Sequence, residues 1–130
     1  MTVLACGINH KTAHIDLRER VAVNMSSMEE TLHELIAQEA VNEAVVVSTC
    51  NRTEIIAKVD CDMAMQDWLS SRYGLDPVEF SQHAYTFSDE AAVQHLMRVA
   101  CGLDSMLLGE PQILGQVKQA YFAACEAGTV

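Results

Sequence analysis

The residues best suited to covalent chemistry lie around Cys50, in the polar segment Ser48–Glu54. A β-branched run typical of a strand precedes this segment, so Cys50 is expected where a strand ends in an accessible loop. A cysteine becomes nucleophilic when neighbouring groups stabilise its thiolate; Arg52 is two residues away, and Thr49 and Asn51 can donate hydrogen bonds. Cys50 is therefore a candidate nucleophile, although a buried structural thiol is the commoner role of a free cysteine.

His95 is the candidate imidazole partner of Cys50. The apolar residues around it have the i, i+3, i+4, i+7 spacing of one helical stripe, expected to face the core: Val93, Leu96, Met97 and Ala100. A rotation of about 100° per residue then turns His95 and Arg98 to the opposite side of the helix. This pattern is compatible both with a catalytic imidazole and with an ordinary solvated surface position.

The other cysteines and histidines indicate less chemistry. Cys6, His10 and His14 fall on a segment that changes from strand to loop, so their spacing predicts no common face and no metal site. Three cysteines lie beside or within apolar helical patterns and are expected to be structural: Cys61, Cys101 and Cys125. The glycines between residues 102 and 115 form neither a P-loop nor a dinucleotide-binding pattern.

The composition indicates one globular domain. The chain has 130 residues, of which 50% are hydrophobic and 20% charged. It has neither a long apolar stretch nor an N-terminal secretory pattern, so we expect a cytoplasmic location without membrane contact, and five irregularly spaced cysteines favour reduced thiols. The net charge of −10 argues against general nucleic-acid binding by this chain alone.

The elements that must position these residues alternate between strand and helix. Strands are expected at Val3–Ile8, Ala44–Val47, Ile55–Val59 and His83–Phe87. Helices are expected from the capping boxes Ser26/Glu29 and Ser27/Glu30 through Ile36, over Asp62–Tyr73, after a cap at Ser88, and over Gln112–Ala127. This order predicts an α+β fold, a split βαβ (ferredoxin-like) antiparallel sheet packed with helices and carrying extra C-terminal helices.

Four blocks of sequence carry a family resemblance. They are Gly7–Ala13, Leu17–Arg20, Ser48–Glu54 and His95–Lys118. In this order they closely resemble the N-terminal catalytic domain of bacterial glutamyl-tRNA reductase. The resemblance spans nearly all of residues 1–130, and one visible departure is Cys101, where a small residue such as serine is expected.

The resemblance implies the reduction of glutamyl-tRNA by NADPH to glutamate-1-semialdehyde, in tetrapyrrole and haem biosynthesis. Cys50 matches the family's nucleophile, which forms a glutamyl thioester. Family members continue into an NADPH-binding domain and a dimerisation domain that this chain lacks, so the resemblance implies NADPH bound elsewhere. It also implies a homodimeric full-length enzyme and possible channelling of the product to an aminomutase.

The resemblance also implies roles for individual residues. Arg52 is expected to clamp the carboxylate of the glutamyl side chain, and the other substrate-binding residues are expected to be Thr49, Asn51, Ser105, Glu110 and Gln112. His95 is expected beside the thioester, where it could take the thiol proton, assist the departing tRNA hydroxyl or only orient the substrate.

Two other functions stay open on sequence. The isolated domain could serve as a docking or regulatory surface, for a protease adaptor or for haem bound through a cysteine or histidine. A small cysteine hydrolase built on Cys50 and His95 is the third reading, and the sequence offers it no evident orienting residue.

Overall fold

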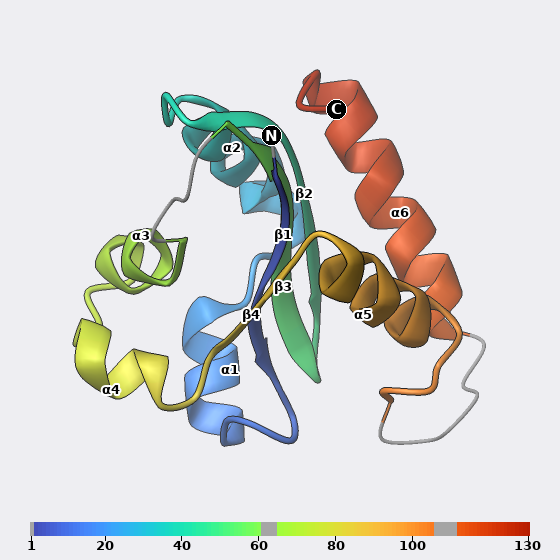
Figure 1. The fold of residues 1–130 in the computed structure, drawn as a ribbon. Coiled ribbons are helices and arrows are strands. Elements are labelled where there is room, and N and C mark those ends of the chain that lie inside the picture. The colour runs from blue at the N-terminus through green and yellow to red at the C-terminus, as the bar shows by residue number, and fades with distance from the viewer. Residues whose placement is uncertain (1, 61–64, 106–111) are drawn as a thin grey trace.

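A four-stranded antiparallel sheet with helices on both faces forms the computed structural model, which describes residues 2–60, 65–105 and 112–130 (Figure 1). The strands are β1 (Thr2–Asn9), β2 (Val41–Thr49), β3 (Arg52–Val59) and β4 (Tyr85–Ser88), in the order β2-β3-β1-β4. The helices are α1 (Ile15–Val21), α2 (Met25–Ile36), α3 (Met65–Arg72), α4 (Pro77–Ser81), α5 (Glu90–Ala100) and α6 (Gln112–Ala127). This strand order is that of the split βαβ fold, so the predicted fold class is confirmed.

One face of the sheet carries most of the hydrophobic core, because alternate residues of each strand point to opposite faces. This apolar face consists of Leu4, Cys6, Ile8, Ala44, Val46, Ile55, Ala57 and Val59. Helices α1 to α4 supply the residues that pack on it, so they form one layer of the molecule (Figure 1). The strands β1, β2 and β3 therefore contribute to this face through alternate residues.

Helix α2 buries the predicted stripe but begins differently from the prediction. Met28, Leu32 and Leu35 are buried against the apolar face. The N-cap is Asn24, whose side chain accepts a hydrogen bond from the Ser27 backbone N–H at 3.0 Å. The predicted capping boxes at Ser26 and Ser27 are wrong, because both serines lie inside the first turn that Asn24 already caps.

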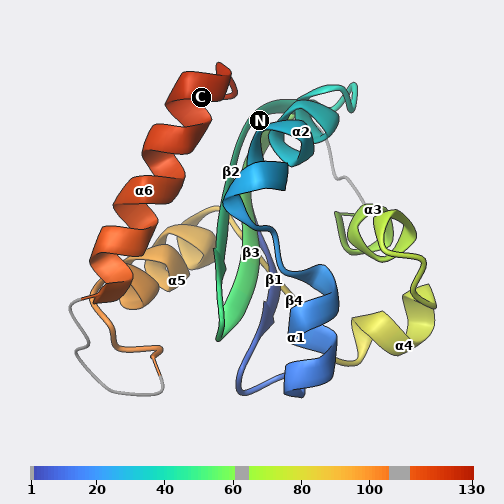
Figure 2. The same ribbon diagram turned by 180° about the vertical axis from the view of Figure 1, so that it is seen from behind.

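The second face of the sheet is covered by α5 and α6, which lie together on the side opposite α1, α3 and α4 (Figure 2). We call it the charged face, after the polar residues that point from it: Asn9, Arg52, Glu54 and Tyr85. Gly7 pairs with Glu54 there, and a Cβ at Gly7 would lie 2.1 Å from the Thr53 carbonyl oxygen. Only a residue without a side chain lets β1 and β3 approach this closely.

Helix α6 matches its prediction and ends at the edge of β2. The Ala44 N–H donates to the Thr129 carbonyl at 2.8 Å, and the Thr129 hydroxyl donates to the Ala44 carbonyl at 3.0 Å. The end of α6 is therefore fixed to the same strand that leads to Cys50.

Helix α4 was not predicted. Asp76 and Pro77 indicated only the end of the preceding helix, but they also form a helix start: the Asp76 side chain accepts from the Val78 N–H, and Pro77 occupies the first turn. The start of the predicted helix Asp62–Tyr73 falls partly outside the described residues, and its described part is α3, which is followed by Gly74 with φ of 66°.

Candidate functional site

Cys50 occupies a two-residue turn rather than a loop. Thr49 is the last residue of β2 and pairs with Arg52, the first residue of β3, so only Cys50 and Asn51 lie between the strands. The predicted polar loop Ser48–Glu54 is therefore wrong in extent. The Cys50 side chain is exposed, which agrees with an accessible thiol rather than a buried structural one.

Two contacts fix the backbone of this turn. Arg18 of α1 donates from Nε to the Cys50 carbonyl at 3.3 Å and from a terminal nitrogen to the Ala13 carbonyl at 2.8 Å. The Asn51 N–H donates to the Thr49 hydroxyl at 3.1 Å. Cys50 is thus presented by a rigid hairpin that α1 holds from the side.

Arg52 lies directly beside the turn and is almost completely buried, with 1% of its surface exposed. One terminal nitrogen of its guanidinium contacts Glu54 at 3.2 Å, and the other contacts the Asp104 carboxylate at 2.9 Å and the Asp104 carbonyl at 2.8 Å. Burial by itself lowers the pKa of Arg52, but the charges of Glu54 and Asp104 outweigh burial and raise that pKa. Arg52 therefore stays positively charged on the charged face.

Glu54 is the centre of a buried polar network. Its two carboxylate oxygens contact Arg52, the Tyr85 hydroxyl and Nε2 of His95. Burial tends to raise the pKa of Glu54, but the hydrogen bond and charge of His95, together with Arg52 and Tyr85, lower it overall. Burial and the adjacent Glu54 carboxylate raise the pKa of Tyr85, so the tyrosine remains a hydrogen-bond donor. The network is a charged carboxylate surrounded by donors.

His95 faces the sheet, which corrects the predicted orientation of α5. Its ring stacks on Phe87 with centroids 4.6 Å apart, and the helix buries Ala92 and Val99 beside it. Val93 and Met97, which were expected in the core, are 48% and 65% exposed. A different apolar stripe, Ala92, Leu96 and Val99, turns toward the sheet together with His95, which contacts Glu54. Arg98 is exposed and does not share the position of His95.

The start of α5 also differs from prediction. Asp89, not Ser88, is the residue before the helix, and it has a φ of 51° and makes no side-chain cap. Its carboxylate instead accepts from the Val3 N–H at 3.2 Å, and its own N–H donates to the Val3 carbonyl at 2.7 Å. The start of α5 is therefore tied to β1 rather than capped.

Asp104 contacts both Arg52 and residues of the first sequence block, Gly7–Ala13. Its carboxylate contacts Nζ of Lys11 at 3.1 Å and the Asn9 side-chain amide at 3.4 Å, in addition to Arg52. Burial tends to raise the pKa of Asp104, but the hydrogen bonds and charges of Arg52 and Lys11 lower it overall. The pKa of nearby His10 is lowered by its burial and by the charges of Arg52 and Lys11. These cations favour a neutral imidazole and an ionised aspartate at neutral pH.

The other described site residues lie in the hairpin, after the end of α5 and at the start of α6. Thr49 and Asn51 are half-buried in the hairpin, Ser105 is half-buried directly after Asp104, and Gln112 is exposed at the start of α6. Glu110 lies outside the described residues. The structure thus brings Arg52 and His95 together through Glu54.

Four residues of the site were missed by sequence reasoning: Arg18, Glu54, Tyr85 and Asp104. The signal for Glu54 was present, because period-two alternation places Arg52 and Glu54 on one face of a strand. Tyr85 and Asp104 lie 31 and 52 residues along the chain from the groups they contact, Glu54 and Arg52. Spacing along the chain carries no signal for such contacts.

The remaining cysteines divide into two kinds. Burial raises the pKa of Cys6 to about 11, so its thiol stays protonated within the apolar face. Cys101 and Cys125 are exposed, so their predicted structural roles are wrong, and Cys61 lies outside the described residues. Exposure alone therefore does not distinguish Cys50, whereas its place beside Arg52 does.

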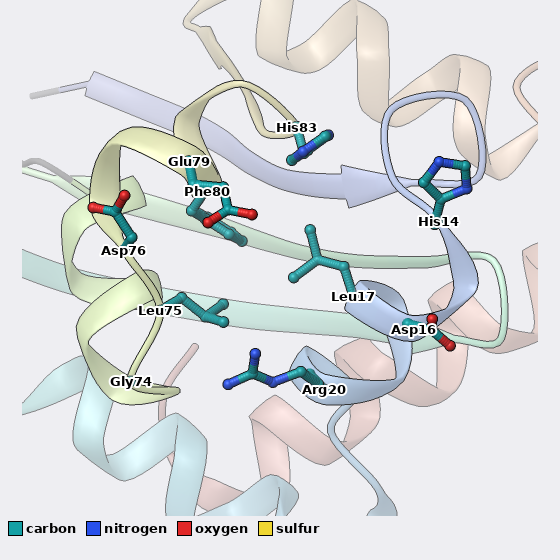
Figure 3. Close-up of a pocket in the computed structure, with 10 residues that line it drawn as sticks. All are labelled: His14, Asp16, Leu17, Arg20, Gly74, Leu75, Asp76, Glu79, Phe80 and His83. Atoms are coloured by element: carbon teal, nitrogen blue, oxygen red, sulfur yellow. The ribbon is translucent and has the colours of Figure 1, made fainter.

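A separate hollow of about 390 Å³ lies between α1 and the segment that joins α3 to α4 (Figure 3). Leu17, Leu75 and Phe80 form its apolar middle, and Arg20 and His83 lie toward different ends. The predicted site residues are not among the described residues that line it, so it is distinct from the charged face. Within the described ranges, the helices include none long and apolar enough to cross a membrane.

Comparison with known proteins gives one consistent result. The family model described as "Glutamyl-tRNAGlu reductase, N-terminal domain" matches residues 6–130. The glutamyl-tRNA reductase of Pseudoalteromonas translucida (strain TAC 125) is 53% identical over 95% of this chain, and that of Shewanella sp. (strain MR-7) is 50% identical over all of it. The chain spans 30% and 31%, respectively, of the length of these two relatives.

A solved structure agrees with the family model. The glutamyl-tRNA reductase from Methanopyrus kandleri superposes with a TM-score of 0.80 at 31% identity. The match covers 98% of this chain and 29% of that protein. The similarity therefore includes the fold as well as the sequence blocks.

Proposed function

Because the chain belongs to the family of glutamyl-tRNA reductase N-terminal domains, we propose that Cys50 accepts the glutamyl group of glutamyl-tRNA as an enzyme thioester. The observation that carries the proposal is an exposed thiol in a rigid turn next to a buried, permanently charged arginine. The turn supplies the nucleophile and Arg52 supplies a site for the glutamyl carboxylate.

The proposed step is a transfer of an acyl group from oxygen to sulfur. The Cys50 sulfur attacks the ester carbonyl carbon, so a C–S bond forms and the C–O bond to the terminal ribose breaks. The ribose oxygen leaves with the bonding electron pair and takes up the proton lost by the thiol. The product is a thioester, which is more reactive toward a hydride than the original ester.

Arg52 is proposed to bind the side-chain carboxylate of the glutamyl group. A guanidinium binds a carboxylate through two parallel, charge-assisted hydrogen bonds, which a lysine ammonium cannot reproduce. Thr49 and Asn51 flank the thiol within the hairpin and are proposed to contact the same group. We propose the same role for Ser105 and Gln112.

His95 is proposed to move or hold a proton near the reacting ester. Its Nε2 contacts Glu54, so among the described hydrogen bonds Nδ1 is the ring nitrogen left for proton exchange. One carboxylate oxygen of Glu54 contacts Nε2 of the His95 imidazole, and the other contacts the Arg52 guanidinium. Glu54 is therefore a positioning residue for both groups.

We propose that reduction of the thioester uses a site outside residues 1–130. Residues 1–130 carry no dinucleotide-binding glycine pattern, so they do not fit a site for NADPH, and we derive no step through it. We propose that NADPH acts in the complete enzyme to yield glutamate-1-semialdehyde for tetrapyrrole synthesis. A homodimeric enzyme in the cytoplasm and transfer of the aldehyde to an aminomutase stay predictions.

The decisive experiment is mass spectrometry of the intact chain after mixing with glutamyl-tRNA. We expect a glutamyl adduct that hydroxylamine releases and that Cys50→Ala abolishes. Cys101→Ala and Cys125→Ala are matched controls, because both remove exposed cysteines away from the hairpin. An adduct that persists in Cys50→Ala would contradict the proposal.

A further inference from the structure

Asp104 occupies the position at Arg52 that the proposed function gives to the substrate. We propose that the Asp104 carboxylate is an internal counterion that the glutamyl side-chain carboxylate must displace from Arg52, so that Asp104 lowers the affinity of this arginine for every ligand that needs it. This inference rests on the proposed function, because it concerns the same arginine. It adds a residue that sets the affinity of the site and does not react.

Of the two anions described at Arg52, only Asp104 is placed to exchange. The Glu54 side chain is 1% exposed, whereas that of Asp104 is 14% exposed and that of Lys11 beyond it is 56% exposed. A carboxylate that arrives from solvent therefore meets Lys11 and Asp104 before it reaches Arg52. Glu54 remains behind the guanidinium with Tyr85 and His95.

The contacts of Asp104 permit its carboxylate to leave without releasing Arg52. One carboxylate oxygen binds Lys11, and the other binds Arg52 and, at 3.4 Å, the Asn9 amide. Rotation of the side chain outward can therefore break the contacts with Arg52 and Asn9 while Lys11 keeps its own. The Asp104 carbonyl also accepts from Arg52 at 2.8 Å, and this backbone contact keeps the guanidinium oriented.

The local backbone suits such a movement. Asp104 follows the end of α5, where Gly102 has a φ of 78° and the Leu103 N–H closes the helix by donating to the Arg98 carbonyl at 2.9 Å. Asp104 is thus outside every strand and helix, and a change of its side-chain torsion breaks no ladder or helical hydrogen bond.

Charge balance shows which ligand can take the place of Asp104. When a glutamyl carboxylate replaces Asp104, the buried guanidinium keeps two anionic partners. A glutaminyl amide would leave it with Glu54 as its one described anionic partner, because the amide oxygen accepts a hydrogen bond but carries no net charge. The cost of displacing Asp104 is the same for both ligands, so it lowers both affinities and leaves their ratio to the difference between carboxylate and amide.

The test compares Asp104→Asn with the wild-type chain, using the α-methyl esters of glutamate and glutamine as binding probes. The variant is expected to bind the glutamate ester roughly tenfold more tightly, the range of a charge-assisted hydrogen bond, and to keep its preference for glutamate over glutamine. Asp104→Glu should keep the wild-type affinity, and Asp67→Asn, which removes an exposed charge from α3, should leave it unchanged. Circular dichroism checks that each variant is folded.

The outcomes separate this inference from the proposed function. If Asp104→Asn binds the glutamate ester no more tightly than the wild-type chain does, Asp104 is not a displaceable counterion. If Asp104→Asn fails to fold, Asp104→Glu decides alone, and a changed affinity for the glutamate ester in that variant overturns the inference. Thioester formation at Cys50 is measured in parallel, so a missing adduct counts against the proposed function only.

Discussion

The two faces of the sheet differ in how their residues are held. On β3, Ile55 and Ala57 point into the apolar face and pack against helices, whereas Arg52 and Glu54 alternate with them and point into the charged face. Packing on the apolar face is non-directional, and many residues of similar shape would fill it. The charged face depends on particular partners, since each buried polar group needs its own hydrogen bond. One face of β3 therefore contributes to the hydrophobic core and the other to the proposed site.

The strongest way to break the charged face is to remove Glu54. Glu54→Ala removes the fully buried anionic partner of Arg52 and leaves the guanidinium with Asp104 as its one described anionic partner, so the free energy of unfolding should fall by about 3–5 kcal/mol. Thioester formation should be lost as well, because Arg52 loses one of its two described anionic contacts and His95 loses its contact with Glu54. Urea denaturation and adduct mass spectrometry check the two effects. Glu43→Ala is the control: its side chain is 46% exposed beside Lys58, and a loss as large there would show that any strand carboxylate matters equally.

The neighbouring residue tests the apolar face. Ile55→Ala should lower the free energy of unfolding by about 2–5 kcal/mol through lost burial and the cavity that remains. The rate of thioester formation per folded molecule should change little, because Ile55 points away from Arg52. A loss of rate comparable to that of Glu54→Ala would mean that the two faces do not act separately.

Acid should weaken the charged face selectively. The pKa values of Glu54 and Asp104 are lowered in the folded chain, so both groups take up protons more readily when it unfolds. Their contribution to stability is present above the ordinary carboxyl values of 4.5 and 3.8 and is lost as the pH falls through the lowered ones. We expect a smaller effect than from either substitution, because the side chains stay in place. Urea denaturation from pH 6 to pH 2 should show a shallower decline in Glu54→Gln, and an unchanged decline would contradict this origin.

The smallest expected effect comes from the residues that precede α2, on the apolar face, and α5, on the charged face. Asn24→Ala removes the N-cap of α2, which packs on the apolar face, and should lower the free energy of unfolding by about 1 kcal/mol. Ser88→Ala, before α5 on the charged face, should change stability by less than about 0.5 kcal/mol, because an exposed residue that caps nothing has little to lose. Thermal denaturation of both variants checks the difference, and equal losses would restore the capping role predicted for Ser88.

The sequence predicts the apolar face well because its signals are local. The strands, the stripe of α2 and the extent of α6 follow from periodicity, and periodicity is enforced by burial against one continuous layer. The wrong predictions of helix starts also have physical causes. Ser26 and Ser27 could have capped α2, but Asn24 precedes them, and Pro77 begins a helix as readily as it ends one. Such choices depend on one residue and leave no periodic signal.

The site was predictable only in part. The proximity of Cys50 and Arg52 was predicted because they lie in one short segment, and it follows from the hairpin. The orientation of α5 was predicted wrongly because the helix offers two apolar stripes, and the one with Ala92 and Val99 is buried, on the side from which His95 reaches Glu54 across the fold. Contacts between distant segments, such as that of Asp104 with Arg52, depend on the fold and have no counterpart in spacing.

Gly7 has a consequence for how this sequence can vary. Since a methyl group there would lie 2.1 Å from the Thr53 carbonyl oxygen and 2.8 Å from the Glu54 Cα, no single change elsewhere opens enough room for it. A variant at position 7 must move the backbone of β3, and with it the residue that holds both Arg52 and His95. Natural or laboratory variants of this domain should therefore keep glycine at position 7, while the exposed positions of the helices can vary.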